Sequence, residues 1–330
     1  MIELTEIESA ARRIAGHVVR TPTVPSPGLS ELLGVPVTAK LELLQRTGSF
    51  KARGAAAKLL TLDGAQRAAG VVAVSGGNHG IAVAVMSRAV DVKATVVMPR
   101  SAPARAVEIA TAAGATVRVV DTMAEAFDLM DRLQADGLTL LHPFDDPVVL
   151  AGQGTVGLEF ADDVFTGDTS VDARMAPTDV LVSIGGGALI SGVAAAMRAR
   201  RPELRIWGVE TDCAQAMAQA RRHGGPVPVE LSSIVTTLSA PTVSQLTYDH
   251  VRALVTDVLV VSDAEAVRGS IDLAEHAKVW AEPAAGCLLP AARRVIERVG
   301  PDVRLGLVIC GGNATVADLA GWARRFDLLG

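Results

Sequence analysis

Thr47-Gly48-Ser49-Phe50-Lys51 is the stretch around which the rest of this chain is interpreted, because it joins a strand-like run to a helical pattern. The strand-like run is 37–42, and the alanine-rich segment 52–60 predicts a helix. We expect Ser49 to cap this helix and Lys51 to lie in its first turn, where the helix dipole disfavours an ammonium group. A lysine of lowered pKa can form a Schiff base, although most lysines in such a pattern are ordinary solvated residues.

Three further glycine-rich turns each follow an apolar strand-like run and precede a helical pattern. They are Ser75-Gly76-Gly77-Asn78-His79-Gly80, Gly185-Gly186-Gly187-Ala188 and Cys310-Gly311-Gly312-Asn313, the last of which precedes a helix expected from Ala314 onward. Backbone amides at a helix N-terminus bind anions, and glycines let the chain approach a phosphate closely. These turns strengthen the functional interpretation of Lys51.

Strand-like runs alternate with alanine-rich helical patterns along most of the chain. They lie at 71–74, 93–98, 116–120 and 138–141, and again at 180–184, 205–209, 258–261 and 304–309. Such alternation is typical of parallel sheets covered by helices on both faces. We therefore expect an α/β protein with two open, parallel-type sheets, and one polar loop at 166–178.

The composition is that of an ordinary globular protein. The 330 residues are 49% hydrophobic and 20% charged, with a net charge of -5 and only 3% aromatic residues. Nucleic-acid binding calls for a basic surface or stacking aromatic residues, so we exclude that partner. Glycines and serines interrupt the uncharged run 180–197, which predicts a strand, a turn and a buried helix in place of a membrane span.

The cysteines and the N-terminal segment predict a cytoplasmic location. Cys213, Cys287 and Cys310 are widely spaced, which fits a reducing compartment and forms no zinc-binding spacing. Residues 1–19 mix Glu and Arg without an apolar segment, so we expect no signal peptide.

Five motifs occur together and in one order along the chain. They are Ser49-Phe50-Lys51 and the segments 75–80, 142–155, 185–189 and 310–313. With these motifs the chain resembles the pyridoxal-phosphate-dependent enzymes of the serine/threonine dehydratase family, which have fold type II. The resemblance extends from residue 21 to about residue 317.

The family resemblance implies a two-domain organisation. Residues 1–69 and 146–330 would form a large cofactor-binding domain, and residues 70–145 a small domain inserted into it. The cofactor would lie in the cleft between them. Open α/β sheets bind ligands at the carboxyl ends of their strands, which agrees with such a cleft.

The resemblance also implies a role for each motif. Lys51 would hold pyridoxal 5'-phosphate as a covalent aldimine and, once released, would remove the substrate's α-proton. Other cofactor contacts would come from Phe50, Asn78, Glu282, Cys310 and the backbone amides of Gly185, Gly186, Gly187, Ala188 and Leu189. The substrate carboxylate would be bound by Ser75, Gly76, Gly77, Asn78 and His79, although loop packing is the simpler role for this histidine.

Cys310 bears on the type of reaction, because by resemblance it faces the pyridine nitrogen. A thiol cannot stabilise a protonated pyridinium as a carboxylate does, which leaves the ring a poorer electron sink. That favours rapid loss of a β-hydroxyl group over transamination. Its residue type alone favours a small buried side chain at a strand end, but its place directly before Gly311-Gly312-Asn313 favours the functional interpretation.

The expected activity is that of a dehydratase, or ammonia-lyase, acting on a small β-hydroxy amino acid. Threonine or serine is the default substrate, hydroxyaspartate and phenylserine are options, and the products are a 2-oxo acid and ammonia, formed through an aminoacrylate-type intermediate. Family members are commonly dimers or tetramers, so a homodimer or homotetramer is expected.

Two other functions stay open at this point. A β-replacement enzyme of the same fold would usually carry Thr-Ser-Gly-Asn-Thr-Gly at the position of the turn 75–80, and this chain lacks that sequence. A non-catalytic nucleotide-binding protein would need the spaced G-x-G-x-x-G pattern, which is also missing. Racemisation is disfavoured because Gly76 stands where the racemases of the family carry a second serine. Ser239-Ala240 replaces the usual Asp-Gly near the substrate pocket, which leaves the preferred side chain open.

Glu210 and Ala214 are the candidates for a cation site. The cation-binding members of the family also have an acidic or hydroxyl residue six positions past the glutamate, where this chain has Ala216. Hard cations prefer several oxygen ligands, so we expect no tight magnesium site. A loosely held monovalent cation and an ordinary strand-end carboxylate are the two interpretations of Glu210.

Overall fold

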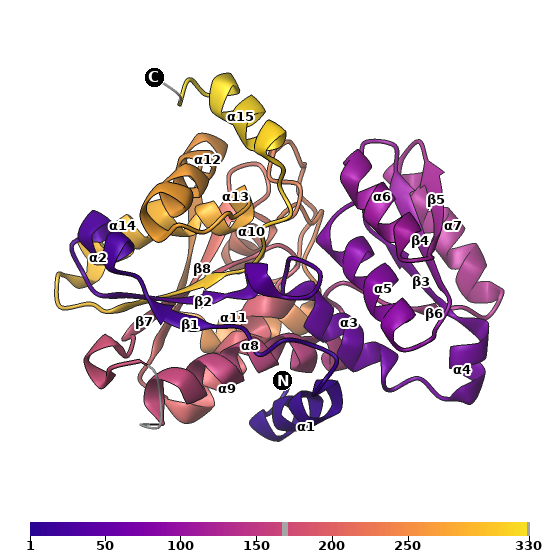
Figure 1. Ribbon diagram of the computed structural model, residues 1–330, viewed down its shortest axis with the longest axis horizontal. Helices are drawn as coiled ribbons and strands as arrows, with labels where there is room; N and C mark the ends of the chain where they lie inside the picture. The colour runs from indigo at the N-terminus through magenta and orange to yellow at the C-terminus, as the bar shows by residue number, and fades with distance from the viewer. Residues whose placement is uncertain (167–170, 329–330) are drawn as a thin grey trace.

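The computed structural model describes residues 1–166 and 171–328, which form two helix-covered sheets lying side by side (Figure 1). The larger sheet has six strands in the order β1-β2-β10-β7-β8-β9, and in it only β1 runs antiparallel to its neighbour. The smaller sheet has four parallel strands in the order β5-β4-β3-β6. The predicted α/β class with parallel-type sheets is therefore confirmed.

The strands end within two residues of their predicted positions. Their bounds are β1 Thr23–Pro25, β2 Val37–Leu41, β3 Val71–Val74, β4 Ala94–Pro99, β5 Thr116–Val120, β6 Thr139–Leu140, β7 Asp179–Ser183, β8 Arg205–Thr211, β9 Asp257–Val261 and β10 Leu305–Ile309. Every residue of β2, β7 and β10 is buried, as expected for central strands covered on both faces. The short β1 was not predicted.

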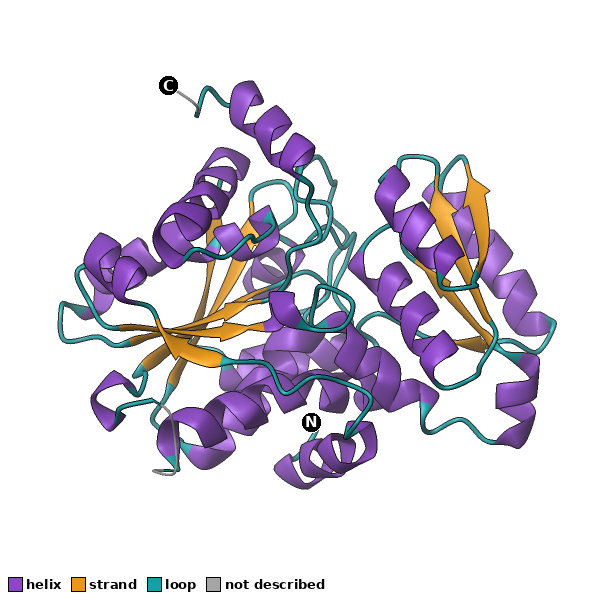
Figure 2. Cartoon of the chain, viewed as in Figure 1, coloured by secondary structure: helices purple, strands orange, loops and turns teal. Residues whose placement is uncertain are grey.

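Helices fill most of the remaining chain (Figure 2). The α-helices are α1 Leu4–Ile14, α2 Pro27–Leu33, α3 Lys51–Leu59, α4 Gly64–Ala69, α5 Asn78–Ala89, α6 Ala104–Ala112, α7 Met123–Ala135, α8 Pro147–Phe165, α9 Ala188–Arg200, α10 Ala216–His223, α11 Gln245–Leu254, α12 Asp263–Asp272, α13 Pro283–Gly286, α14 Leu288–Val299 and α15 Val316–Arg325. Short 3-10 turns lie at Glu42–Leu44 and Ala173–Met175, and a π-helical turn lies at Leu273–Ala277.

Alternate residues of the smaller sheet pack against helices on opposite faces. Val71 and Ala73 of β3 belong to one apolar cluster with residues of α5 and α6. Val72, between them, belongs to another cluster with residues of α7. This is the period-2 alternation of a strand buried on both sides.

Helix α8 packs tightly against α3 and α9 through glycines. A Cβ atom at Gly152 would lie 2.8 Å from the Cα atom of Gly54 in α3. One at Gly154 would lie 3.2 Å from the carbonyl oxygen of Gly192 in α9. The three helices can approach this closely only because these positions carry no side chain, so α3 is held firmly beneath the larger sheet.

The expected cap of one helix and the expected start of another were wrong, although Lys51 does lie in the first turn of α3. Helix α3 begins at Lys51 with Phe50 as its N-cap, and the buried hydroxyl of Ser49 has no hydrogen-bond partner. Ser49 instead forms an antiparallel bridge with Gly311, so its backbone follows the sheet and its hydroxyl does not reach the helix end. The last helix begins at Val316, where Thr315 and Asp318 form a capping box.

All strands of the smaller sheet lie within the predicted insertion 70–145, and the larger sheet takes strands from both sides of it. The domain boundaries themselves stay a prediction. Part of the expected polar loop, residues 167–170, lies outside the described residues. Among those described, no helix combines the length and the apolar character needed to cross a membrane.

Candidate active site

Parallel register brings the ends of three central strands to one edge of the larger sheet. Leu305 of β10 lies opposite Val37 of β2 and opposite Asp179 of β7, so the three strands start level and end close together. The turns that follow them therefore meet at this edge. The backbone N–H of Phe50 donates to the carbonyl of Cys310 (3.0 Å), which joins the turn before α3 to the turn after β10.

A cavity lies at this edge, where segments from both sheets meet. Lys51, the glycine turn 185–189 and Cys310 border it from the larger sheet, and Asn78 borders it at the start of α5. Glu282, at the start of α13, completes this group. The structure thus brings every predicted cofactor contact to one cavity.

Lys51 is the first residue of α3, and its ammonium nitrogen lies inside the cavity wall. Nζ donates to the carbonyl oxygen of Pro143 (3.1 Å) and lies 5.2 Å from the ring centroid of Phe50. Burial lowers the pKa of Lys51 to about 8, while Cys310 acts in the opposite direction. The lowered pKa was expected, but burial is its main cause, where the sequence had indicated the helix dipole.

The turn 185–189 leads from β7 into α9 and has no room for a side chain at Gly186 or Gly187. A Cβ atom at Gly186 would lie 2.0 Å from Cδ1 of Phe144, and Gly187 has a φ of +96°, which favours glycine. Helix α9 begins at Ala188, and the first N–H groups of a helix have no acceptor within it. The amides of this turn can therefore donate to an anion in the cavity.

Three polar side chains form a hydrogen-bonded cluster beside the cavity. Asn78 donates from Nδ2 to Oε1 of Glu282 (2.7 Å) and accepts at Oδ1 from Nδ2 of Asn313 (2.7 Å). The backbone N–H of Asn313 donates to Oε2 of Glu282 (3.2 Å). Burial raises the pKa of Glu282 to about 7, although hydrogen bonds from Asn78, Asn313 and Thr237 oppose the shift.

The buried Cys310 directly follows β10 and borders the cavity. Burial raises the pKa of its thiol well above the usual value, and the nearby Glu282 and Cys287 act in the same direction. Cys310 is therefore a neutral thiol at neutral pH. Burial likewise raises the pKa of Cys287 to about 12.

The asparagine loop, 75–79, separates into two kinds of residue. Gly76 and Gly77 border a second cavity next to the first, and Asn78 borders both. Ser75 and His79 border neither cavity. The Oγ atom of Ser75 accepts the backbone N–H of Gly77 (3.2 Å) and so shapes the loop.

His79 is buried, and its Nε2 lies 2.8 Å from the carbonyl oxygen of Leu141. Burial, followed by the nearby Lys51, lowers the pKa of His79 to about 3. The ring is therefore neutral and donates to Leu141. This contact fits the packing role that the sequence analysis preferred.

Glu210, the cation candidate, is completely buried in β8 and binds the start of α10. Its two carboxylate oxygens accept the backbone N–H groups of Met217 and Ala218, both at 2.8 Å. Burial raises the pKa of Glu210 to about 8. Ala214 is buried nearby, in the turn before α10. In the described part of the chain, no group of three His, Cys, Asp or Glu residues is arranged to hold a metal ion.

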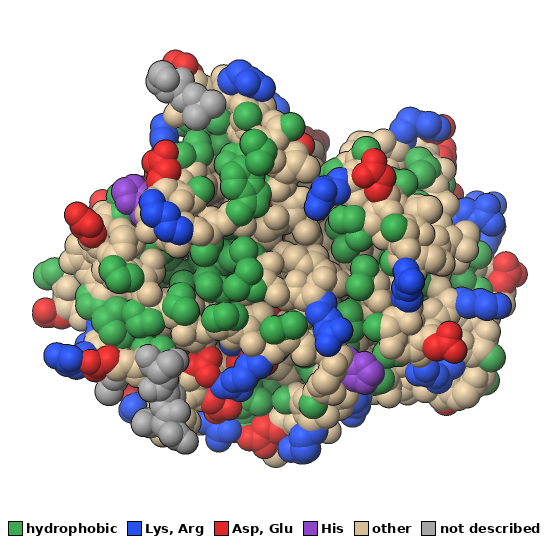
Figure 3. All heavy atoms as spheres, in the orientation of Figure 1, with side chains coloured by type: hydrophobic (Ala, Val, Ile, Leu, Met, Phe, Trp, Pro, Cys, Tyr) green, Lys and Arg blue, Asp and Glu red, His purple; other side chains and the backbone are tan. Residues whose placement is uncertain are grey.

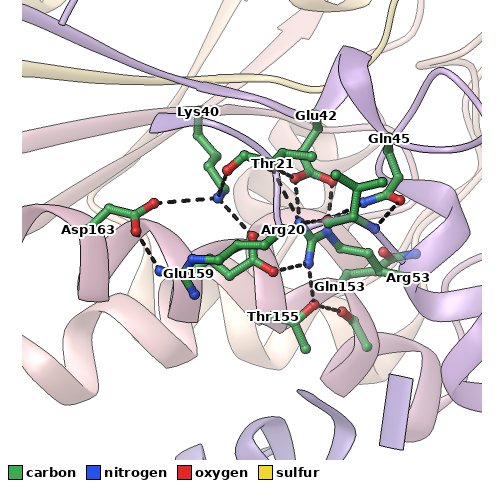
Figure 4. Close-up of polar contacts among 12 residues, drawn as sticks. Arg20, Thr21, Lys40, Glu42, Gln45, Arg53, Gln153, Thr155, Glu159 and Asp163 are labelled. Carbon is green, nitrogen blue, oxygen red and sulfur yellow. Dashed lines mark hydrogen bonds and ion pairs between the residues drawn. The ribbon is translucent and has the colours of Figure 1, made fainter. Parts of the chain in front are cut away.

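A buried network of charges lies next to the lysine-bearing helix (Figure 4). The guanidinium group of Arg53, in α3, donates to both carboxylate oxygens of Glu42 (2.8 Å each) and to those of Glu159 (2.7 and 2.8 Å). Lys40 also binds Glu159 (2.8 Å). Although burial opposes it, this pairing lowers the pKa of Glu159 and raises that of Arg53. The network attaches α3 to β2 and α8.

Some residues at the site had no role predicted from the sequence, and Phe144, Thr237 and Asn313 are examples. Phe144 and Thr237 border the first cavity, and Asn313 belongs to the polar cluster. Asn313 is the last residue of the glycine turn 310–313, and Phe144 lies in the motif segment 142–155. Thr237 carried no signal beyond its place beside Ser239.

The family is established by comparison with known proteins. The family model described as "Pyridoxal-phosphate dependent enzyme" matches residues 14–311. The chain therefore belongs to this family of pyridoxal-phosphate-dependent enzymes, and its cofactor is pyridoxal phosphate. The lysine, the glycine turn 185–189 and the neutral thiol in one cavity fit that cofactor.

The individual relatives include ammonia-lyases, and the solved structures include a racemase of similar fold. L-threo-3-hydroxyaspartate ammonia-lyase from Pseudomonas sp is 37% identical over 96% of each chain. L-threonine ammonia-lyase from Thermotoga maritima is 36% identical over 96% of this chain and 77% of its own length. Among solved structures, maize serine racemase has a TM-score of 0.87 at 32% identity, covering 99% of this chain and 98% of its own.

Proposed function

We propose that this enzyme is a dehydratase that converts a β-hydroxy amino acid to a 2-oxo acid and ammonia. The observation that supports this most directly is the single cavity bordered by the Lys51 amine of lowered pKa, the glycine turn 185–189 and the neutral thiol of Cys310. The relatives named as ammonia-lyases support the same reaction. Threonine and serine are the default substrates, and hydroxyaspartate and phenylserine are the options.

The residues of the cavity divide between holding the cofactor and moving a proton. Pyridoxal phosphate, when bound, supplies an electrophilic aldehyde and an electron-accepting ring. We assign Lys51 to bind that aldehyde and then, as a free amine, to take the substrate's α-proton at Nζ. A pKa of about 8 leaves a useful fraction of this amine unprotonated near neutral pH.

The other contacts follow from the same arrangement. The N–H groups of 185–189 would bind the phosphate, and Phe50 would pack against the ring. Asn78 and Glu282 would lie near the ring hydroxyl, and Cys310 near the ring nitrogen. A neutral thiol there would not hold a proton on the ring, which favours elimination over transamination.

The substrate carboxylate would be bound by the asparagine loop, at Gly76, Gly77 and Asn78, while Ser75 and His79 would hold the loop in shape through their bonds to Gly77 and Leu141. Loss of the α-proton and the β-hydroxide removes one water molecule from the amino acid. Hydrolysis of the resulting enamine consumes one water molecule and releases ammonia with the 2-oxo acid. The net reaction therefore needs no oxidant or reductant.

Racemisation, the activity named for the maize relative, has less support in this chain. A serine at position 76 would serve as the acid or base on the second ring face. A Cβ atom at Gly76 would lie only 2.7 Å from the Cβ atom of Ala102. The asparagine loop therefore has no space for that serine as it stands. β-Replacement stays the alternative within the same chemistry.

A cytoplasmic location and a homodimer or homotetramer complete the proposal. The location is based on the three free cysteines. The assembly is based on the dimers and tetramers that are common among members of the family. A loosely bound monovalent cation near Glu210 stays a prediction, and the hydrogen bonds of this carboxylate to α10 support a structural role for it.

The proposed function is tested by measuring 2-oxo acid and ammonia together. The purified holoenzyme is incubated with L- and D-serine, threonine, 3-hydroxyaspartate and phenylserine. We expect equal amounts of both products from at least one L-amino acid, and loss of both products and of the cofactor's yellow absorbance in Lys51→Ala. Full turnover by Lys51→Ala would refute the assignment of the lysine.

A further inference from the structure

A second cavity of about 110 Å³ opens directly beside the cofactor cavity. Asn78, Thr237 and Glu282 border both cavities, so the two cavities are neighbours that share this wall. The second cavity lies between α6 of the smaller sheet and α15 at the end of the chain. Figure 3 shows a notch between these two parts, with hydrophobic side chains on both of its sides.

The walls of this second cavity are largely apolar. Ile81 and Ile109 contribute from α5 and α6, and Ile234 and Trp322 contribute from the opposite side. An apolar cavity of about 150 Å³ in another protein is large enough to hold benzene. The second cavity is smaller, at about 110 Å³, but it opens to solvent, so it can enclose much of an aryl ring or a branched alkyl group while the rest of the group lies at its mouth.

The charged groups of this cavity do not favour an acidic ligand. Arg105 and Asp318 border it and are exposed, so its exposed lining carries one cation and one anion. Asp318 also accepts from the backbone and hydroxyl of Thr315 (2.9 and 2.7 Å), which holds the carboxylate in place. At the inner end, Glu282 would repel a second carboxylate on the substrate.

We propose that this cavity receives the β-substituent of the substrate and that the enzyme prefers β-hydroxy amino acids with a large apolar substituent. Such a substituent is an aryl or branched alkyl group, and phenylserine is the simplest example. This inference rests on the proposed dehydratase function and specifies its substrate class. A substrate bound through its carboxylate at Gly76 and Gly77 already touches the wall of the cavity.

The test compares kcat/KM of the holoenzyme for L-phenylserine, L-threonine, L-serine and L-3-hydroxyaspartate. Each added apolar carbon group in a matched pocket is worth roughly tenfold or more, so phenylserine should exceed serine by at least that factor. Ile109→Asp should lower the ratio of phenylserine to serine at least tenfold. Glu108→Ala, one residue away on α6 and outside the cavity, is the control that should leave the ratio unchanged.

A second measurement needs no variant. L-Phenylalanine lacks the β-hydroxyl group, so it should inhibit without reacting, and its inhibition constant should be at least tenfold lower than that of L-alanine. Turnover of serine and threonine without a preference for phenylserine would overturn the inference and leave the dehydratase intact. A preference for 3-hydroxyaspartate would overturn it, because Arg105 would then bind a carboxylate on the substrate's side chain. Tight binding of phenylalanine with no 2-oxo acid from any substrate would support the cavity and refute the dehydratase.

Discussion

Replacing Arg53 by methionine should destabilise the protein strongly, because it removes the centre of the buried charge network. The side chains of Arg53 and Glu42 are both fully inaccessible to solvent, at 0% each. Methionine fills similar space but donates no hydrogen bond, so the carboxylate of Glu42 would be left buried without its cationic partner. Removing one partner of a buried ion pair costs about 3–5 kcal/mol.

The matched control is Arg100→Met, which breaks an ion pair of the same type on the surface. The side chains of Arg100 and Asp121 are 72% and 63% exposed. Exposed pairs contribute about 0–1 kcal/mol. The two substitutions are identical in chemistry, so the difference between them measures the effect of burial.

The assay is thermal unfolding of the apoprotein followed by circular dichroism. At roughly 2–4 °C per kcal/mol for a large domain, Arg53→Met should lower Tm on the order of 10 °C. Adding Glu42→Gln should recover part of the loss, because it removes the unpaired charge. An Arg53→Met protein no less stable than Arg100→Met would refute the reasoning, since the network would then be hydrated and weak.

The same network predicts that the stability of the folded state falls at acid pH. The pKa of Glu159 is lowered from its usual 4.5, so its pairing stabilises the folded state above that pH. This contribution is lost as the pH falls through the lowered value. Arg53→Met should therefore flatten the acid limb of the stability profile, and an unchanged acid limb would show that Glu159 is not the group responsible.

Three further outcomes follow from the site. Because burial lowers the pKa of Lys51 to about 8, recovery of cofactor absorbance by the apoprotein should rise with pH around 8; a midpoint near 10.5 would contradict this. Gly186→Ala should weaken cofactor retention about tenfold in an absorbance titration, since overpacking costs about 1–3 kcal/mol, and Phe144→Ala should restore part of it. Gly76→Ser should lower activity without producing racemisation, as judged by chiral chromatography, because Ala102 occupies the space; D-serine formed from L-serine would refute this.

The strands and turns could be predicted from the sequence because their signals are local. Runs such as 71–74 and 305–309 are apolar throughout, and a glycine turn marks where each of them ends. The parallel register then places those turns at one edge, so the cavity could be expected before its geometry was known. The prediction that Lys51 is a reactive amine was based more on the glycine turns elsewhere in the chain than on the helix that carries the lysine.

The remaining features depend on contacts between distant residues, which leave no local pattern. Arg53 and Glu159 are separated by 106 positions, and Asn78 and Asn313 by 235. The cap by Ser49 was wrong for the same reason, because the bridge to Gly311 fixes its backbone. Local propensity indicated a serine cap, and the long-range pairing overrode it.

Glu282 explains how the two sheets can form one site. It lies on the larger-sheet side, yet its carboxylate accepts a hydrogen bond from Asn78, the first residue of α5 on the smaller-sheet side. Asn313 binds Asn78 through its side chain and Glu282 through its backbone N–H, so three residues join the two sheets at this point. Moving α5 away from the larger sheet would break both hydrogen bonds of the Asn78 side chain, at a cost of about 1–3 kcal/mol for each buried group left unpaired. The cluster therefore opposes separation of the two sheets at the wall that both cavities share, where the substrate's α-carbon and β-substituent would have to be positioned.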